Sequence, residues 1–218
     1  MKNHRLKIFL LSLYIAAFIW SVVEPKDFFI WLLEVAPALI GLAVVMLTYK
    51  SFPLTPLACI LITLHACILF IGGHYTHAEV PLFDWIRDNF YGTRNNYDKL
   101  VHFVQGLMPA IIAREIFIRK GIVENRKWLS YFVITTCMSL SAGYEVLEWT
   151  LAAITGAAAD AFLGTQGYAW DTQSDMLYTT IGAAFALWMF SPLHDRQILY
   201  LQAQPGILYV SKRLNVTT

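Results

Sequence analysis

Eight titratable residues fall into four pairs whose members stand three or four positions apart in the chain. This spacing puts both members of a pair on one face of a helix. All eight lie in or beside long apolar runs, where an unpaired charge is costly, so such groups usually pair with one another, line a wet cavity or bind a ligand. The pairs are His74 with His77, Asp98 with His102, Glu145 with Glu148, and Asp171 with Asp175.

Three histidines and five carboxylates form a set of ligands that suits a divalent cation. Imidazole favours zinc or iron, and carboxylate oxygen favours harder ions. A bound metal can activate water for the hydrolysis of a lipid or of a lipid-linked head group. The sequence does not identify a cofactor, but it makes a divalent metal the candidate, with ligands among His74, His77, Asp98, His102, Asp171 and Asp175.

Glu145 and Glu148 are the candidate catalytic residues. Two acids on one face of an apolar helix repel each other unless one is protonated or countered, and a spare carboxylate can act as a general base. The chain contains no HExxH, GxSxG or P-loop motif, so the reaction type depends on the composition of the site alone. The sequence therefore does not decide whether the protein is an enzyme.

Two other interpretations remain open. In the first, the protein is a non-enzymatic one that binds or transports a lipid or small molecule, and the acids bind a cationic head group or gate protons. Six helices without an internal repeat are few for a complete alternating-access transporter, although a homo-oligomer would supply more. In the second, the pairs only hold helices together: Asp98 forms an ion pair with His102 or Lys99, and Asp171 caps a helix.

The composition is that of a membrane protein. Hydrophobic residues make up 57% of the 218 residues and charged residues 14%, whereas soluble domains carry roughly a quarter charged residues. A net charge of +1 argues against nucleic acid and leaves membrane lipids as partners. The apolar runs are continuous and long enough to cross a bilayer as helices. We predict an all-α polytopic membrane helix bundle, one integral domain over residues 1–218, with about six transmembrane helices near 7–23, 28–47, 54–73, 100–118, 128–154 and 176–192.

The distribution of basic residues predicts how these helices cross the membrane. With the N-terminus inside, twelve of the 16 Lys and Arg residues fall on the inner side, which favours an N-in, C-in topology. Asp98 then stands at the outer mouth of the fourth helix, with His102 roughly 6 Å deeper, and Glu145 has risen roughly 25 Å along the fifth. All four pairs are therefore predicted on the outer, periplasmic side.

Three segments lie outside the predicted spans. Residues 82–91 mix aromatic and charged side chains, which is typical of a short interfacial helix. Residues 156–170 are rich in small side chains and could form a lid, a re-entrant segment or a plain loop. The chain after Pro192 has no spanning run, so we predict a mobile C-terminal tail there.

Three motifs resemble the YjdF-type bacterial inner-membrane proteins: YDKLVHF from Tyr97, YEVLEW from Tyr144 and WDTQSDML from Trp170. The resemblance extends over nearly the whole chain. It implies a multi-pass protein of the bacterial inner (cytoplasmic) membrane, in a family without an established activity. More distantly, the DKxxH motif, the acidic helix and the spacing of Asp175 and Gly182 are similar to VanZ-like membrane proteins, which implies an envelope lipid or its precursor as the class of ligand.

Overall fold

The structure is a computed structural model that describes residues 2–90, 92–155 and 165–203. Within these ranges the secondary structure is helical, without a β-strand, which confirms the predicted all-α class. The elements are α1 (Lys2–Val22), α2 (Phe28–Thr48), α3 (Pro56–Tyr75), the short 3-10 helix η1 (His77–Glu79), α4 (Pro81–Asn89), α5 (Tyr97–Arg119), α6 (Arg126–Thr155) and α8 (Asp171–Gln202).

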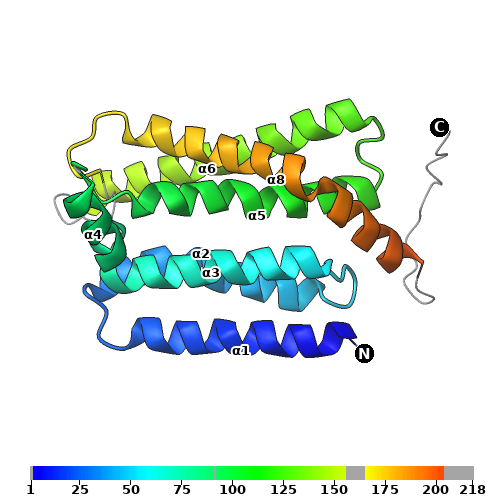
Figure 1. The fold of residues 1–218 in the computed structure, drawn as a ribbon, viewed down its shortest axis with the longest axis horizontal. Helices are drawn as coiled ribbons and strands as arrows, with labels where there is room; N and C mark the ends of the chain where they lie inside the picture. The colour runs from blue at the N-terminus through cyan, green and yellow to red at the C-terminus, as the bar shows by residue number, and fades with distance from the viewer. Residues whose placement is uncertain (1, 91, 156–164, 204–218) are drawn as a thin grey trace.

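Five of the described helices are long and apolar enough to cross a membrane: α1 from His4, α2, α3, α5 and α8. The sixth long helix, α6, has 30 residues and runs alongside α5 and α8 (Figure 1). Its serines, threonines and two glutamates lower its hydropathy, so α6 is not among these five. The prediction of a polytopic membrane bundle is confirmed.

The last helix differs from its predicted bounds of 176–192. It begins at Asp171 and continues through Pro192 to Gln202, so the first ten residues of the predicted mobile tail are helical. Proline removes one backbone donor and usually bends a helix without ending it when the flanking turns are well packed. The helix changes direction towards its end (Figure 1). The rest of the predicted tail, and most of the 156–170 segment, lie outside the described residues.

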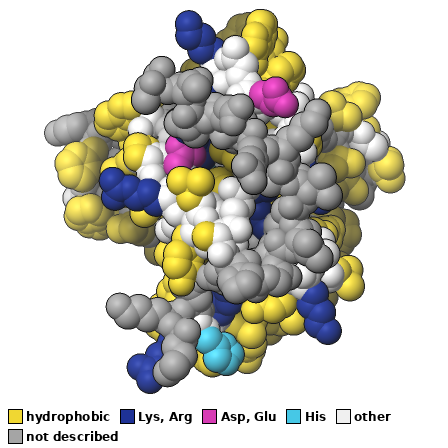
Figure 2. Space-filling view, turned by 90° about the vertical axis from the view of Figure 1, so that its right-hand side faces the viewer, with side chains coloured by type: hydrophobic (Ala, Val, Ile, Leu, Met, Phe, Trp, Pro, Cys, Tyr) yellow, Lys and Arg dark blue, Asp and Glu magenta, His cyan; other side chains and the backbone are white. Residues whose placement is uncertain are grey.

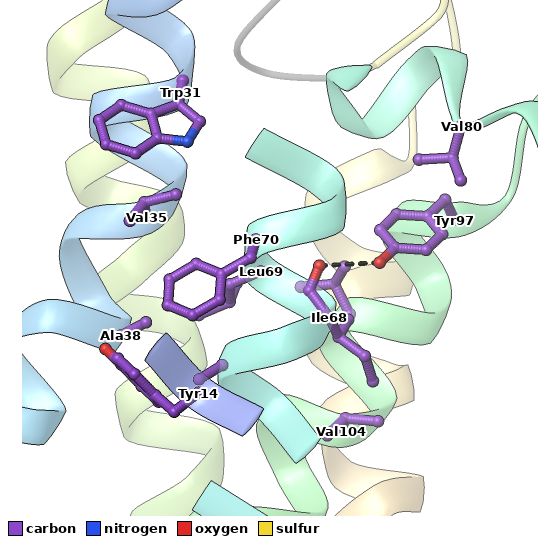
Figure 3. Close-up of a cluster of buried hydrophobic side chains, with 12 residues drawn as sticks. Tyr14, Trp31, Val35, Ala38, Ile68, Leu69, Phe70, Val80, Tyr97 and Val104 are labelled. Carbon is purple, nitrogen blue, oxygen red and sulfur yellow. Dashed lines mark hydrogen bonds between the residues drawn. The ribbon is translucent and has the colours of Figure 1, made fainter. Parts of the chain in front are cut away.

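The long helices form two groups that meet at α3 and α5. Helices α1 and α2 pack on α3, and helices α6 and α8 pack on α5 (Figure 1). Figure 3 shows the core of the first group, where Tyr14 of α1, Trp31 of α2 and Phe70 of α3 are buried together. The Tyr97 hydroxyl at the start of α5 donates a 2.7 Å hydrogen bond to the Ile68 carbonyl of α3, which joins the two groups.

Two glycines let the backbones of α5 and α8 touch. A Cβ atom added at Gly106 would overlap the Thr179 carbonyl, and one added at Gly182 would overlap the Phe103 carbonyl. Small residues at such crossings are typical of membrane helices, whose association depends on close backbone packing. This contact holds the first turns of α5 and α8 side by side, and those turns carry Asp98 and Asp175.

The two ends of the bundle differ in character. Helix α1 begins and α8 ends at one end (Figure 1), and Figure 2 looks onto this end, where exposed Lys and Arg side chains stand around the face. The opposite end carries α4, which exposes Leu82, Trp85 and Ile86. Helix α4 lies within one residue of the predicted start of the interfacial helix, and its exposed apolar side chains suit a membrane surface.

Candidate functional site

The structure brings polar side chains from five elements together at the α4 end of the bundle. The side chains project from the half of each long helix that is nearest the α4 end of the bundle, and they are buried there. We call the following residues the polar cluster: Glu34 from α2, His77 from η1, Asp98, Lys99 and His102 from α5, Glu145 and Glu148 from α6, and Asp171 and Asp175 from α8.

At its centre, Asp98, His102 and Asp175 each offer one ligand atom, and these atoms lie within 4.8 Å of one another. His102 Nε2 is 3.4 Å from Asp98 Oδ1 and 3.9 Å from Asp175 Oδ1. Glu145 Oε1 is also 3.9 Å from His102 Nε2. Two carboxylates and one imidazole, all buried, fit the coordination of a divalent cation. The buried Asp98 Oδ2 and Glu145 Oε1 atoms have no hydrogen-bond partner, which is what an additional ligand would relieve.

Lys99 connects two carboxylates of the cluster, a role that the sequence did not predict. Its Nζ atom donates hydrogen bonds of 2.6 Å to both Asp171 Oδ1 and Asp175 Oδ1, and Arg94 Nη1 bonds the same Asp171 oxygen at 2.7 Å. Asp171 is thus held by two cations and lies outside the close group of Asp98, His102 and Asp175. The sequence signal was weak, because Lys99 was interpreted only as a neighbour of Asp98.

Carbonyl and amide contacts fix the loop that carries Arg94. The Asn95 amide N–H donates to Gln166 Oε1 at 2.9 Å, and Gln166 Nε2 donates to the Asn95 carbonyl at 2.8 Å. The Asn95 side chain donates to the Val80 carbonyl at 3.0 Å. Tyr168 lies close by, with its ring centroid 5.4 Å from the Arg94 guanidinium. The segment before α8 is therefore tied to the segment before α5 on the outer surface of the cluster.

His77 joins two helices through its two ring nitrogens. Nδ1 is 3.3 Å from Asp98 Oδ1, and Nε2 is 3.0 Å from Glu34 Oε2. Burial alone would lower the pKa of His77, but the Glu34 and Asp98 carboxylates outweigh it and raise the pKa well above its ordinary value. Glu34 was missed at the sequence level. Its only signal is that it is a lone acid within the apolar run of α2, where an unpaired charge would be costly.

His74 does not join the cluster, so the assumed pairing of His74 with His77 is wrong. Helix α3 ends at Tyr75, and Thr76 adopts a left-handed backbone with a φ of 67°. The two histidines therefore do not share one helix face. The His74 ring instead lies against the Trp20 ring, tilted by 33° with centroids 4.4 Å apart, and its Nδ1 lies 3.3 Å from the Ser21 carbonyl of α1.

Glu145 borders both the cluster and a groove in the surface. The groove has a volume of about 410 Å³ and lies between α6 and the first turns of α8. Its walls are mixed, with Val146, Trp149 and Met176 beside Glu145 and Thr172. Glu148 lies one turn further along α6 and is also buried. The groove thus leads from the apolar flank of the bundle to a carboxylate of the cluster.

The charges of the cluster do not balance by themselves. Six buried carboxylates belong to it, whereas Lys99 and the adjacent Arg94 are its permanent cations. If all six carboxylates are ionised, two negative charges remain in excess even with His77 and His102 both protonated. Buried charge of this kind is unfavourable unless protons or a further cation neutralise it. A single divalent cation would supply the missing charge.

A second buried ionic cluster lies at the opposite end of the bundle. Glu115 of α5 accepts hydrogen bonds from the Thr55 amide at 3.1 Å and from the Thr55 hydroxyl at 2.7 Å, and it pairs with Arg119. His194 Nε2 is 3.2 Å from Glu115, and Arg114 Nη1 is 3.1 Å from His194 Nδ1. Because arginine can only donate, His194 Nδ1 must accept and Nε2–H must donate. These contacts join α3, α5 and α8.

Comparisons with known proteins match most of the chain. A family model described as a predicted membrane protein (DUF2238) matches residues 6–196. The inner membrane protein YjdF of Escherichia coli (strain K12) is 43% identical over 180 residues, which cover 83% of this chain and 86% of that protein. No solved structure matches the chain. The likeness to VanZ-like proteins stays a prediction.

Proposed function

The chain belongs to the DUF2238 family of predicted membrane proteins, and from this premise we propose that it is a metal-dependent enzyme that acts on a lipid or lipid-linked substrate of the bacterial envelope. It is a multi-pass inner membrane protein, as its likeness to YjdF and its five apolar helices indicate. The polar cluster is the proposed active site.

The observation that carries this proposal is the close grouping of Asp98, His102 and Asp175. Their ligand atoms lie within 4.8 Å of one another in a buried setting, and the surrounding cluster has more carboxylates than permanent cations. In this proposal the three residues would hold one divalent cation, whose contribution would be to lower the pKa of water at the site. Glu145, 3.9 Å from His102, accepts the proton as general base.

The position of the cluster supports a substrate that comes from the membrane. The groove between α6 and α8 opens on the flank of the bundle, and Trp149 and Met176 give it an apolar wall beside Glu145. A lipid chain can lie along such a wall while its head group reaches the carboxylate. We place the cluster on the periplasmic side, because the exposed basic residues gather at the other end and basic residues favour the cytoplasm (Figure 2).

The metal content of the detergent-purified protein tests the proposal. We expect about one divalent ion per chain in the wild type, lost in His102→Gln and in Asp175→Asn, because each removes one ligand of the group. His74→Ala is the matched control, since His74 contacts α1 and not the cluster, and it should retain the metal. A wild type that stays free of metal after loading, or variants that bind as tightly as the wild type, would overturn the metal-dependent function.

One observation favours a second candidate, a non-enzymatic protein that binds or transports a lipid or small molecule. Lys99 already gives Asp171 and Asp175 a hydrogen-bonded cation at 2.6 Å, so those two acids do not require a metal. The remaining carboxylates would then bind a cationic head group entering by the groove. A metal-free wild type that binds a cationic amphiphile, with binding lost in Glu145→Gln, would support this candidate. A homo-oligomer stays a prediction.

A further inference from the structure

A small cavity lies directly inside the polar cluster, deeper in the bundle. It has a volume of about 60 Å³, and its lining includes His65, His77, His102, Gln105 and Tyr144. These residues come from α3, η1, α5 and α6, so the cavity lies where the two groups of helices meet. Pro37, Leu69 and Val101 complete the lining, so the polar side chains place a few polar atoms on a wall that is mostly apolar.

Polar atoms at this cavity lack protein partners. His102 is buried, and its Nδ1 atom has no hydrogen-bond partner. Among the described residues, the side chains of His65, Gln105 and Tyr144 also line the cavity without a hydrogen bond to protein, and of these four residues His102 carries the fully buried unpartnered atom. Buried polar groups are nearly always hydrogen-bonded, either to protein or to ordered water. The cavity is large enough for water, since one water molecule needs a cavity volume on the order of 10–15 Å³.

We propose that ordered water fills this cavity and forms a hydrated chamber that links His102 to His65. A water bonded to His102 Nδ1 sets the orientation of the ring, so that Nε2 faces Asp98 and Asp175. Metal-binding and catalytic histidines commonly need such a partner on the second nitrogen. The inference does not depend on the proposed enzymatic function, because the chamber follows from the cavity and its unpartnered groups alone.

The chamber carries water towards the middle of the membrane. His65 stands ten residues before Tyr75, the last residue of α3, which corresponds to roughly 15 Å along the helix. That is about half of a hydrocarbon core of roughly 30 Å. A chain of water between His102 and His65 would let a proton move between the cluster and this depth. His65 is then the inner end of the hydrated chamber.

Radiolytic hydroxyl-radical labelling of the intact protein, read by mass spectrometry, tests the chamber. Radicals form from ordered water, so a buried side chain is modified when bound water lies against it. We expect His65 and Tyr144 to be labelled. His194 is the matched control, because it is a fully buried histidine whose two ring nitrogens both have protein partners. It should show only background labelling. Equal labelling of His65 and His194 would overturn the proposal.

Two variants on α5 distinguish labelling by water in the cavity from labelling caused by a less stable protein. Val101 lines the cavity, whereas Val104, one turn away and equally buried, does not. Val101→Phe fills the chamber, so labelling of His65 and Tyr144 should be lost. Val104→Phe adds the same volume elsewhere and should leave the labelling in place. Retained labelling in a folded Val101→Phe protein contradicts the proposal. If neither variant folds, the wild-type comparison of His65 with His194 decides.

Discussion

At the scale of residues, the polar cluster depends on side chains that hold its central acids in place. His77 contacts Asp98 with one ring nitrogen and Glu34 with the other. Lys99 bonds Asp171 and Asp175 together. Positioning of this kind is what a metal ligand or a general base requires, because an ångström of misplacement is costly for binding and for catalysis. Two predictions follow from these contacts.

Gly72 provides the space that the His77 ring occupies. A Cβ atom at Gly72 would overlap the ring at its Cδ2 and Nε2 atoms. We expect Gly72→Ala to displace His77 and to lower the free energy of unfolding by about 1–3 kcal/mol, as overpacking does. Gly143→Ala is the control, because a Cβ at Gly143 meets nothing within 4 Å. Denaturant titration in detergent measures both; equal stability of the two variants would show that His77 moves freely.

Removal of the Lys99 ammonium group would leave the Asp171 and Asp175 carboxylates buried without the cation that they share. We expect Lys99→Met to lower the free energy of unfolding by about 3–5 kcal/mol, which is typical of a broken buried ion pair. Lys99→Met combined with Asp175→Asn should cost less than the sum of the two single changes, because one unpaired charge is gone. A double-mutant cycle measures this. Strict additivity would mean that Lys99 and Asp175 do not interact in solution.

At the scale of elements, the contact between α5 and α8 decides where the cluster forms. Gly106 and Gly182 bring the two backbones together, and this contact sets the first turns of both helices against each other. The second ionic cluster, around Glu115 and His194, fixes the same pair of helices at the opposite end. Together the two contacts define how α5 and α8 are rotated, which determines the side chains that face each other.

A methyl group at the helix crossing should separate α5 from α8. In Gly182→Ala the new Cβ would lie 2.9 Å from the Phe103 carbonyl carbon, and backbone atoms cannot turn aside as a side chain can. We expect a lower melting temperature, and weaker binding of the proposed metal, since Asp175 would move away from His102. Gly41→Ala on α2 is the control, as its Cβ meets nothing within 4 Å. Unchanged melting in Gly182→Ala would refute the close backbone contact.

At the scale of the whole molecule, the bundle is a membrane protein with one polar end and one basic end. The arrangement predicts that α4 lies at the periplasmic surface and that the turn between α5 and α6 lies in the cytoplasm. Asp88 on α4 and Arg126 at the start of α6 both have exposed side chains. They are therefore suitable positions for reporting which side of the membrane each end occupies.

Cysteine labelling in intact cells tests this orientation. A membrane-impermeant thiol reagent should label Asp88→Cys in whole cells, and it should label Arg126→Cys only after the cells are permeabilised. The native protein is the control, because Cys59, Cys67 and Cys137 are buried or half-buried on helices. The reverse pattern would place the polar cluster in the cytoplasm, and the proposed periplasmic substrate would then have to be abandoned.

The amino-acid sequence by itself determined the class of the fold and the end of the bundle at which most of the predicted polar residues gather. Long apolar runs form helices in a bilayer because every backbone group must be paired within the segment. Alternating directions and the rise per residue then place Asp98, His102, Glu145 and Asp175 at one level. These are local properties of the chain, so hydropathy and spacing were sufficient to predict them.

Only the tertiary structure decided which side chains meet. The rotation of each helix about its own axis depends on packing, such as the glycine contact between α5 and α8, which hydropathy does not encode. For this reason Glu34 was not anticipated, and Lys99 was expected beside Asp98 but not as the partner of Asp171 and Asp175. His74 was assigned to it wrongly, because the backbone turn at Thr76 separates it from His77. The cavity beside His102 likewise exists only where five elements meet.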